Sequence, residues 1–143
     1  MVVSLQIVID CADPAQLAEF WANALHYQIQ NPPAGYQSWE QFLQAQGIPQ
    51  ADWNKASAIV DPQGNRPRIF FQRVPEPKTV KNRVHIDLNQ SLPGTPLEER
   101  RQHVDTEVER LKSLGANELY SKEEYHEYWV TMADPEGNEF CVQ

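Results

Sequence analysis

Asp61-Pro-Gln-Gly-Asn65 and Asp134-Pro-Glu-Gly-Asn138 are two copies of one pattern, and each copy leads into a β-rich run, Arg68-Ile-Phe-Phe-Gln72 or Glu139-Phe-Cys-Val-Gln143. Pro after Asp, followed by Gly-Asn, is typical of a tight turn. A tight turn before a β-rich run indicates a hairpin. The repeat therefore predicts a chain built from two copies of one module.

The first half adds a strand and a helix before its hairpin. Leu5-Gln-Ile-Val-Ile-Asp10 has the pattern of a strand, and Asp13-Pro-Ala-Gln16 supplies an N-cap with Pro at the first helical position. The apolar residues that follow recur at spacings of three and four, which predicts a helix with one buried face: Leu17, Phe20, Trp21, Ala24 and Leu25.

The second half repeats this plan. Arg83-Val-His-Ile-Asp-Leu88 predicts a strand, and Thr95-Pro-Leu-Glu98 predicts a second capping box. The helix that follows is expected to end at Gly115. Its predicted buried face consists of Leu97, Val104, Val108 and Leu111.

Each half reads strand, helix and three further strands, so we expect an α+β fold of two βαβββ modules in one domain, residues 1–143. The first module covers residues 1–74 and the second residues 83–143. The Pro-rich and basic stretch 75–82 is the predicted linker. Residues 36–53 have no counterpart in the second half and are expected to form an inserted helix, a lid or a surface elaboration.

Composition and charge limit the class of protein. A net charge of −8 without a basic stripe argues against binding nucleic acid or acidic membranes. No apolar run approaches the roughly 20 residues that span a bilayer, and the start lacks a basic segment, so a cytoplasmic location is expected. Cys11 and Cys141 lie far apart in the sequence and are expected to be free thiols.

Three strings are similar to one known family: Asp13-Pro-Ala-Gln-Leu-Ala-Glu-Phe-Trp21, Arg83-Val-His-Ile-Asp-Leu88 and Asp134-Pro-Glu-Gly-Asn-Glu-Phe-Cys-Val142. In this βαβββ arrangement they resemble the glyoxalase-like branch of the vicinal-oxygen-chelate superfamily, alongside glyoxalase I, extradiol dioxygenases and bleomycin-resistance proteins. The resemblance implies a curved mixed sheet around a cavity, with the helices outside. It does not choose among the superfamily's reactions.

Strand alternation predicts which side chains face that cavity. The core side of these strands is expected to contain, for example, Leu5, Val84 and Phe140, together with the residue two positions after each of them. The opposite side chains would line one ligand cavity: Gln6, Arg68, Phe70, Arg83, His85, Asp87, Glu139 and Cys141. Tyr128 and Trp129 are expected to face opposite ways, one toward the core and one toward the cavity, where aromatic rings stack on planar or cationic ligands.

The resemblance also implies where a metal would bind. Its ligand positions fall on Gln6 and Phe70 in the first module and on His85 and Cys141 in the second. Phe offers no ligand atom, and a hard divalent ion prefers oxygen and imidazole ligands. We therefore predict no metal cofactor, with a divalent metal as the alternative.

The chemistry of the remaining candidates has more than one interpretation. His85 is either a metal ligand or a neutral imidazole that donates to Asp87 or a carbonyl. Asp87 needs a partner, for which Arg83, Arg68 or a ligand cation is expected. Glu139 is the candidate proton carrier of a metal enzyme. Cys141 is a buried thiol or a nucleophile next to His85.

Four functions follow from these alternatives. We predict a small-molecule cavity protein without a complete chelate site. The alternatives are a metal-dependent lyase, isomerase or dioxygenase, and a non-catalytic drug-binding resistance protein. Acid-base catalysis by His85 and Asp87 without a metal is a further interpretation. A homodimer is the expected assembly.

Overall fold

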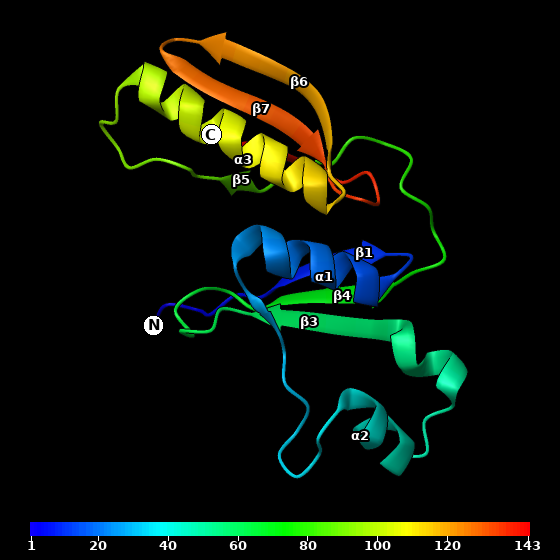
Figure 1. Cartoon of the computed structure of the whole chain (residues 1–143). Coiled ribbons are helices and arrows are strands. Elements are labelled where there is room, and N and C mark those ends of the chain that lie inside the picture. Colours follow the sequence, from blue (N-terminus) through cyan, green and yellow to red (C-terminus); the bar gives the residue numbers. More distant parts are fainter. The chain divides into compact units, whose positions relative to one another are not determined.

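Two four-stranded sheets carry the architecture, one in each of two units, Met1–Pro77 and Lys78–Gln143 (Figure 1). The computed structural model describes all 143 residues of the chain. Each unit is described by itself below. Both are mixed sheets with a long helix packed on them, which confirms the predicted α+β class.

The first unit contains one sheet with strand order β1-β4-β3-β2. Strand β1 pairs in parallel with β4, and the other two pairings are antiparallel. Its elements are β1 (Ile7–Cys11), α1 (Pro14–Leu25), β2 (Gln28–Ile29), α2 (Trp39–Ala45), the 3-10 helix η1 (Gln50–Lys55), β3 (Ala56–Val60) and β4 (Ile69–Arg73).

The second unit has the equivalent strand order, β5-β8-β7-β6. Strand β5 pairs in parallel with β8, and the other two pairings are antiparallel. Its elements are β5 (Asp87–Leu88), α3 (Leu97–Leu114), β6 (Asn117–Glu124), β7 (Glu127–Ala133) and β8 (Glu139–Val142). The predicted repetition of one βαβββ module is therefore confirmed.

The two Asp-Pro-x-Gly-Asn stretches form equivalent turns. In each, the Asp carboxylate accepts hydrogen bonds from the backbone N–H groups two and four residues later. The N–H of Gly64 donates to the carbonyl of Asp61, and that of Gly137 to Asp134, both over 2.9 Å. Both glycines have positive φ, 71° and 88°, where a Cβ is unfavourable. The shared pattern thus connects β3 to β4 and β7 to β8.

Helix α1 begins as its sequence predicts. The side chain of Asp13 accepts a hydrogen bond from the backbone N–H of Gln16, and Pro14 occupies the first turn. The helix packs against β3 and β4. Its buried side chains are Pro14, Leu17, Ala18, Phe20, Trp21, Ala22 and Ala24. The ring of Trp21 meets that of Phe20 edge to face.

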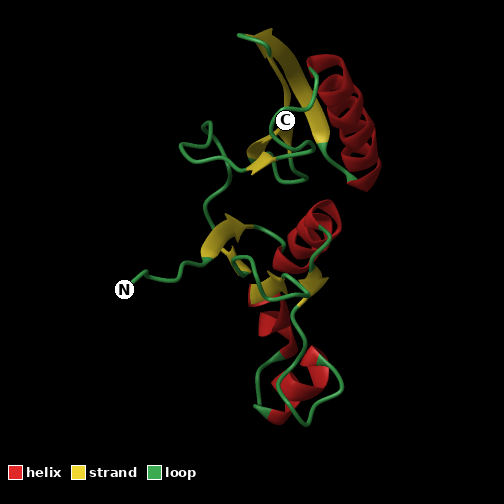
Figure 2. Cartoon of the chain, turned by 90° about the vertical axis from the view of Figure 1, so that its left-hand side faces the viewer, coloured by secondary structure: helices red, strands yellow, loops and turns green.

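Helix α3 packs along one face of the second sheet (Figure 2). Val104, Val108 and Leu111 are buried there, as predicted, whereas Leu97 is only half-buried. Gly115 ends the helix with φ of 114°. The predicted capping box at its start is wrong. Thr95 donates its hydroxyl to the carbonyl of Leu92 instead, and no side chain caps this end. No helix combines the length and apolar character needed to cross a membrane.

Two predicted strands are shorter than expected. Leu5 and Val84, both expected in the core, are 68% and 85% exposed. Strand β1 begins only at Ile7, where pairing with β4 begins, and β5 contains only the two residues that pair with β8. Strand length is therefore set by the partner strand, which the alternation of side chains in one segment does not reveal.

The predicted insertion forms α2 and η1. Ser38 caps α2 through its side chain, which accepts from the N–H of Gln41. The indole of Trp39 anchors the insertion by donating to the carbonyl of Gln30 over 2.6 Å. Helices α1 and α2 lie on opposite sides of the first sheet (Figure 1). Within the insertion, η1 contacts β4 of the sheet, and α2 contacts η1.

Candidate functional site

The second sheet has one face packed on α3 and one face open to a pocket. Phe140 and Val142 of β8 are buried, whereas Glu139 and Cys141 are half-buried on the opposite face, as predicted. Cys141 pairs in register with Asp87 of β5 and with Thr131 of β7. Three polar side chains thus form a row across three adjacent strands.

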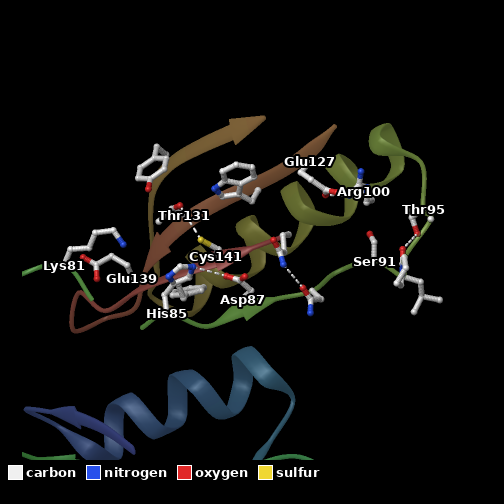
Figure 3. A pocket seen from close by; sticks show the side chains of 18 residues that line it. Lys81, His85, Asp87, Ser91, Thr95, Arg100, Glu127, Thr131, Glu139 and Cys141 are labelled. Atoms are coloured by element: carbon white, nitrogen blue, oxygen red, sulfur yellow. Dashed lines mark hydrogen bonds and ion pairs between the residues drawn. The ribbon is translucent and has the colours of Figure 1, made fainter. Parts of the chain in front are cut away.

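This row lies within a pocket of about 920 Å³ (Figure 3). The lining of the pocket includes residues of the loop between β5 and α3 and residues of β6 and β7. Among its lining residues are Lys81, His85, Asp87, Asn89, Ser91, Arg100, Tyr120, Glu127, Trp129, Thr131, Glu139 and Cys141.

The side chains of His85 and Asp87 are in contact in this pocket. The Nε2 atom of His85 lies 3.3 Å from Oδ1 of Asp87, and both side chains remain accessible, 43% and 41% exposed. The arginine partners predicted for Asp87 are therefore wrong: the imidazole of His85 meets it instead, which is one of the alternatives predicted for His85. Side chains at i and i+2 of an extended segment point the same way, which explains the contact.

Cys141 completes a cluster with this pair. One ligand atom each of His85, Asp87 and Cys141 lies within 4.8 Å of the other two. The sulfur is also 3.5 Å from the hydroxyl oxygen of Thr131. The cluster thus brings together three possible metal-ligand atoms: a nitrogen of His85, an oxygen of Asp87 and the sulfur of Cys141.

Glu139 is engaged elsewhere in the same unit. Its carboxylate accepts from the backbone N–H of Asn82 over 2.9 Å and pairs with Nζ of Lys78 at 3.2 Å. The Asn82 hydrogen bond in particular holds the pKa of Glu139 below its ordinary value. A carboxylate stabilised in its charged form is a weaker proton acceptor, so its predicted role as a proton carrier loses support.

Tyr128 and Trp129 face opposite ways, as their positions in β7 predict. Trp129 lines the pocket. Tyr128 instead donates its hydroxyl to Oδ1 of Asp105 on α3 over 2.7 Å. Burial, aided by this bond, raises the pKa of Tyr128 to about 12. Tyr128 is therefore part of the attachment of α3, and Trp129 is the aromatic residue available to a ligand.

The predicted ligand-binding residues of the first unit surround a guanidinium. Arg68 donates from Nε to Oε1 of Gln30 over 2.6 Å and from Nη1 to Oε1 of Gln6 over 2.7 Å. Its guanidinium carbon lies 5.3 Å from the ring centre of Phe70. Arg68 and Phe70 line a second pocket, of about 500 Å³. Arg83 is exposed and lines neither pocket.

The family-type site for a hard divalent ion does not fit these residues. In the first unit, the side-chain oxygen of Gln6 already accepts from a cation, and Phe70 offers no donor atom. A second positive charge beside Arg68 would be repelled. The second unit offers a mixed set of imidazole, carboxylate and thiol, which is chemically closer to a zinc site than to a manganese or magnesium site.

Some pocket residues were not expected from the sequence. Arg100 of α3 pairs with Glu127 of β7, and Lys81 and Tyr120 also line the pocket. The alternation of β7 places Thr131 on the same face as Trp129, so Thr131 was predictable. The contributions of α3 and of the loop before it were not predictable, because neither segment follows the side-chain alternation of a strand.

A family model described as a glyoxalase-like domain matches residues 6–143. The chain belongs to this family. The match extends over nearly the whole chain and includes both modules, which places the glyoxalase-like protein in the glyoxalase/bleomycin resistance/dioxygenase, or vicinal-oxygen-chelate, superfamily. No curated protein matches the sequence.

Solved structures similar to this glyoxalase-like chain support the fold. A hypothetical protein, SA1046, from S. aureus has a TM-score of 0.59 at 19% identity, covering 99% of this chain and 96% of its own. A glyoxalase/bleomycin resistance protein/dioxygenase family enzyme from Burkholderia phytofirmans has a TM-score of 0.62 at 14% identity, with coverages of 96% and 94%.

A third neighbour is a fosfomycin resistance protein, FosX, from Listeria monocytogenes. A mutant of it was solved with Mn(II) and a dihydroxypropylphosphonic acid. Its TM-score is 0.61 at 16% identity, and the similarity covers all of this chain (100%) and 90% of FosX. At such identities the similarity shows the fold alone.

Proposed function

We propose that this glyoxalase-like protein binds a small organic molecule in the pocket of the second unit and that His85, paired with Asp87, moves a proton to or from it. The observation that carries the proposal is the 3.3 Å contact between the two side chains, both accessible from the pocket. Histidine is the side chain most often used for general acid-base catalysis.

The division of roles follows from the position of each group. Asp87 orients the imidazole through the 3.3 Å contact between its Oδ1 and Nε2 of His85. Trp129 offers an aromatic face to a planar ligand. Glu139, already paired with Lys78, is assigned a structural role at the edge of the pocket. The proposal therefore moves the proton carrier from Glu139 to His85.

A zinc-dependent reaction is the second candidate, favoured by the cluster of His85, Asp87 and Cys141. Ligand atoms around a tetrahedral zinc lie roughly 3.3–3.8 Å apart, given typical bond lengths. The 3.3 Å separation of His85 and Asp87 is close to that range. Three protein ligands leave a fourth position for water or substrate, and bound zinc would polarise an oxygen placed there.

The test uses 4-nitrocatechol, a planar molecule with vicinal oxygens whose absorption spectrum changes when it loses a proton. It is titrated into the wild type, His85→Ala and Asp87→Asn, each with and without a chelator, and the purified proteins undergo elemental analysis. His26→Asn is the matched control, because this histidine lies in the first unit and lines neither pocket.

The two candidates predict different results. Acid-base chemistry by His85 predicts a spectral shift that survives the chelator, disappears in His85→Ala and persists in His26→Asn. A zinc site predicts stoichiometric metal in the wild type, its loss in His85→Ala, and a shift abolished by the chelator. Binding without a spectral shift would contradict both reactions and support the non-catalytic binding protein. An absence of binding would contradict the proposal for this class of ligand.

A further inference from the structure

The first unit contains its own pocket, of about 500 Å³, on the sheet face opposite α1. Its sheet side includes Ala58 of β3 and Phe70 of β4, which are paired in register. The insertion supplies the other side, with large apolar side chains from α2, η1 and the segment between them: Trp39, Leu43, Ile48 and Trp53. An aromatic and aliphatic wall of this kind favours a flat apolar ligand.

One charged group in this pocket has only neutral partners. Arg68 is half-buried, and its Nε and Nη1 donate to the side chains of Gln30 and Gln6. Arg68 makes no ion pair, and its Nη2 makes no hydrogen bond. A partly buried cation without a counter-charge is unfavourable until an anion meets it.

The other charges of this pocket do not neutralise Arg68. Asp52 pairs with Lys55 at 2.9 Å, which leaves no net charge on that pair. Glu40 also lines the pocket, but it is exposed. The half-buried part of the pocket therefore combines aromatic rings with a net positive charge.

We propose that this pocket binds a small aromatic carboxylate. Its ring packs against Trp39, Trp53 and Phe70, and its carboxylate pairs with Arg68, accepting a hydrogen bond from Nη2. Hydrogen bonds between guanidinium and carboxylate groups are among the stronger ones in proteins. The two hydrogen bonds from glutamine side chains hold the guanidinium in place before the ligand binds, which lowers the entropic cost of binding.

The experiment compares 2-naphthoate with 2-naphthylmethanol, its neutral counterpart, by isothermal titration calorimetry. The wild type is expected to bind one naphthoate and to bind the alcohol at least tenfold more weakly. Arg68→Gln should weaken naphthoate binding at least tenfold and leave alcohol binding within twofold. Arg66→Gln is the matched control, because Arg66 is exposed and lies outside the pocket; its naphthoate affinity should equal that of the wild type.

A second variant covers the case in which Arg68→Gln fails to fold. Leu43→Glu places a carboxylate in the pocket from the short helix α2, where no side chain is fully buried. It should abolish naphthoate binding while circular dichroism shows an intact fold. Equal naphthoate affinity in the wild type and either folded variant would overturn the proposal. So would an absence of naphthoate binding to the wild type.

Discussion

Arg68 donates a hydrogen bond from Nη1 to Oε1 of Gln6 over 2.7 Å, so a cation occupies the oxygen that the family resemblance offers to a metal. Phe70, at the other implied ligand position, lies under the same guanidinium. The inner face of the first module is therefore arranged around a guanidinium. The hydrogen bond from Arg68 to Gln6 departs from the metal-ligand pattern that the family resemblance implies. It does so more clearly than the presence of a cysteine at position 141 does.

We predict that the protein forms no stoichiometric Mn(II) complex through the first unit. The repulsion from Arg68 and the engaged oxygen of Gln6 both oppose it. Electron paramagnetic resonance of free Mn(II) during a titration measures this directly. Stoichiometric binding that disappears in Gln6→Ala would contradict the prediction.

The two repeated turns should differ in their contribution to stability. Asp134 is 1% exposed, whereas Asp61 is half-buried and can exchange its hydrogen bonds with water. Asp134→Ala should lower the free energy of unfolding by about 3 kcal/mol, and Asp61→Ala by about 1 kcal/mol, because buried donors left without partners cost more. Urea unfolding of both variants measures the difference. Equal losses would show that burial does not distinguish the turns.

Tyr128 should make stability depend on alkaline pH. Its pKa rises from 10.0 to about 12 in the folded protein, chiefly through burial and the hydrogen bond to Asp105. Folding therefore favours the neutral phenol. The resulting stability is fully present below pH 10 and is lost as the pH rises from about 10 to about 12.

Tyr128→Phe should remove this contribution, so the stability difference between wild type and variant should shrink across that pH range. Urea unfolding at several pH values from 8 to about 11.5 measures it. Tyr125→Phe is the control, because Tyr125 is 88% exposed and makes no such bond. A pH-independent difference for Tyr128→Phe would contradict the assignment.

The repeated fold was predictable because its determinants are local. The Asp-Pro-x-Gly-Asn pattern fixes each turn through hydrogen bonds within five residues, and Asp13 caps α1 through a neighbour three residues away. The alternation of β8 likewise placed Glu139 and Cys141 opposite Phe140. Such contacts depend on few residues, so sequence patterns report them well.

The structure differs from the prediction where a partner strand, or a competing hydrogen-bond partner, determines the local conformation. Pairing partners fixed the length of β1 and β5, leaving Leu5 and Val84 exposed. Thr95 satisfied a nearby carbonyl instead of capping α3.

In the site, the His85–Asp87 contact followed from their spacing, but the position of Arg68 depends on Gln30, 38 residues away. The single cavity predicted to contain all eight inward residues stays a prediction. So do the homodimer and the cytoplasmic location, which contacts within one chain do not determine.

The protonation state of His85 tests the central claim most directly. Nuclear magnetic resonance of the imidazole nitrogens in 15N-histidine-labelled protein, assigned with His85→Ala, follows all four histidines during titration with 4-nitrocatechol in the presence of a chelator. We predict that the His85 signals move toward those of imidazolium as the ligand loses its proton, while His26, His103 and His126 stay unchanged. Ligand binding that leaves His85 neutral would contradict the account.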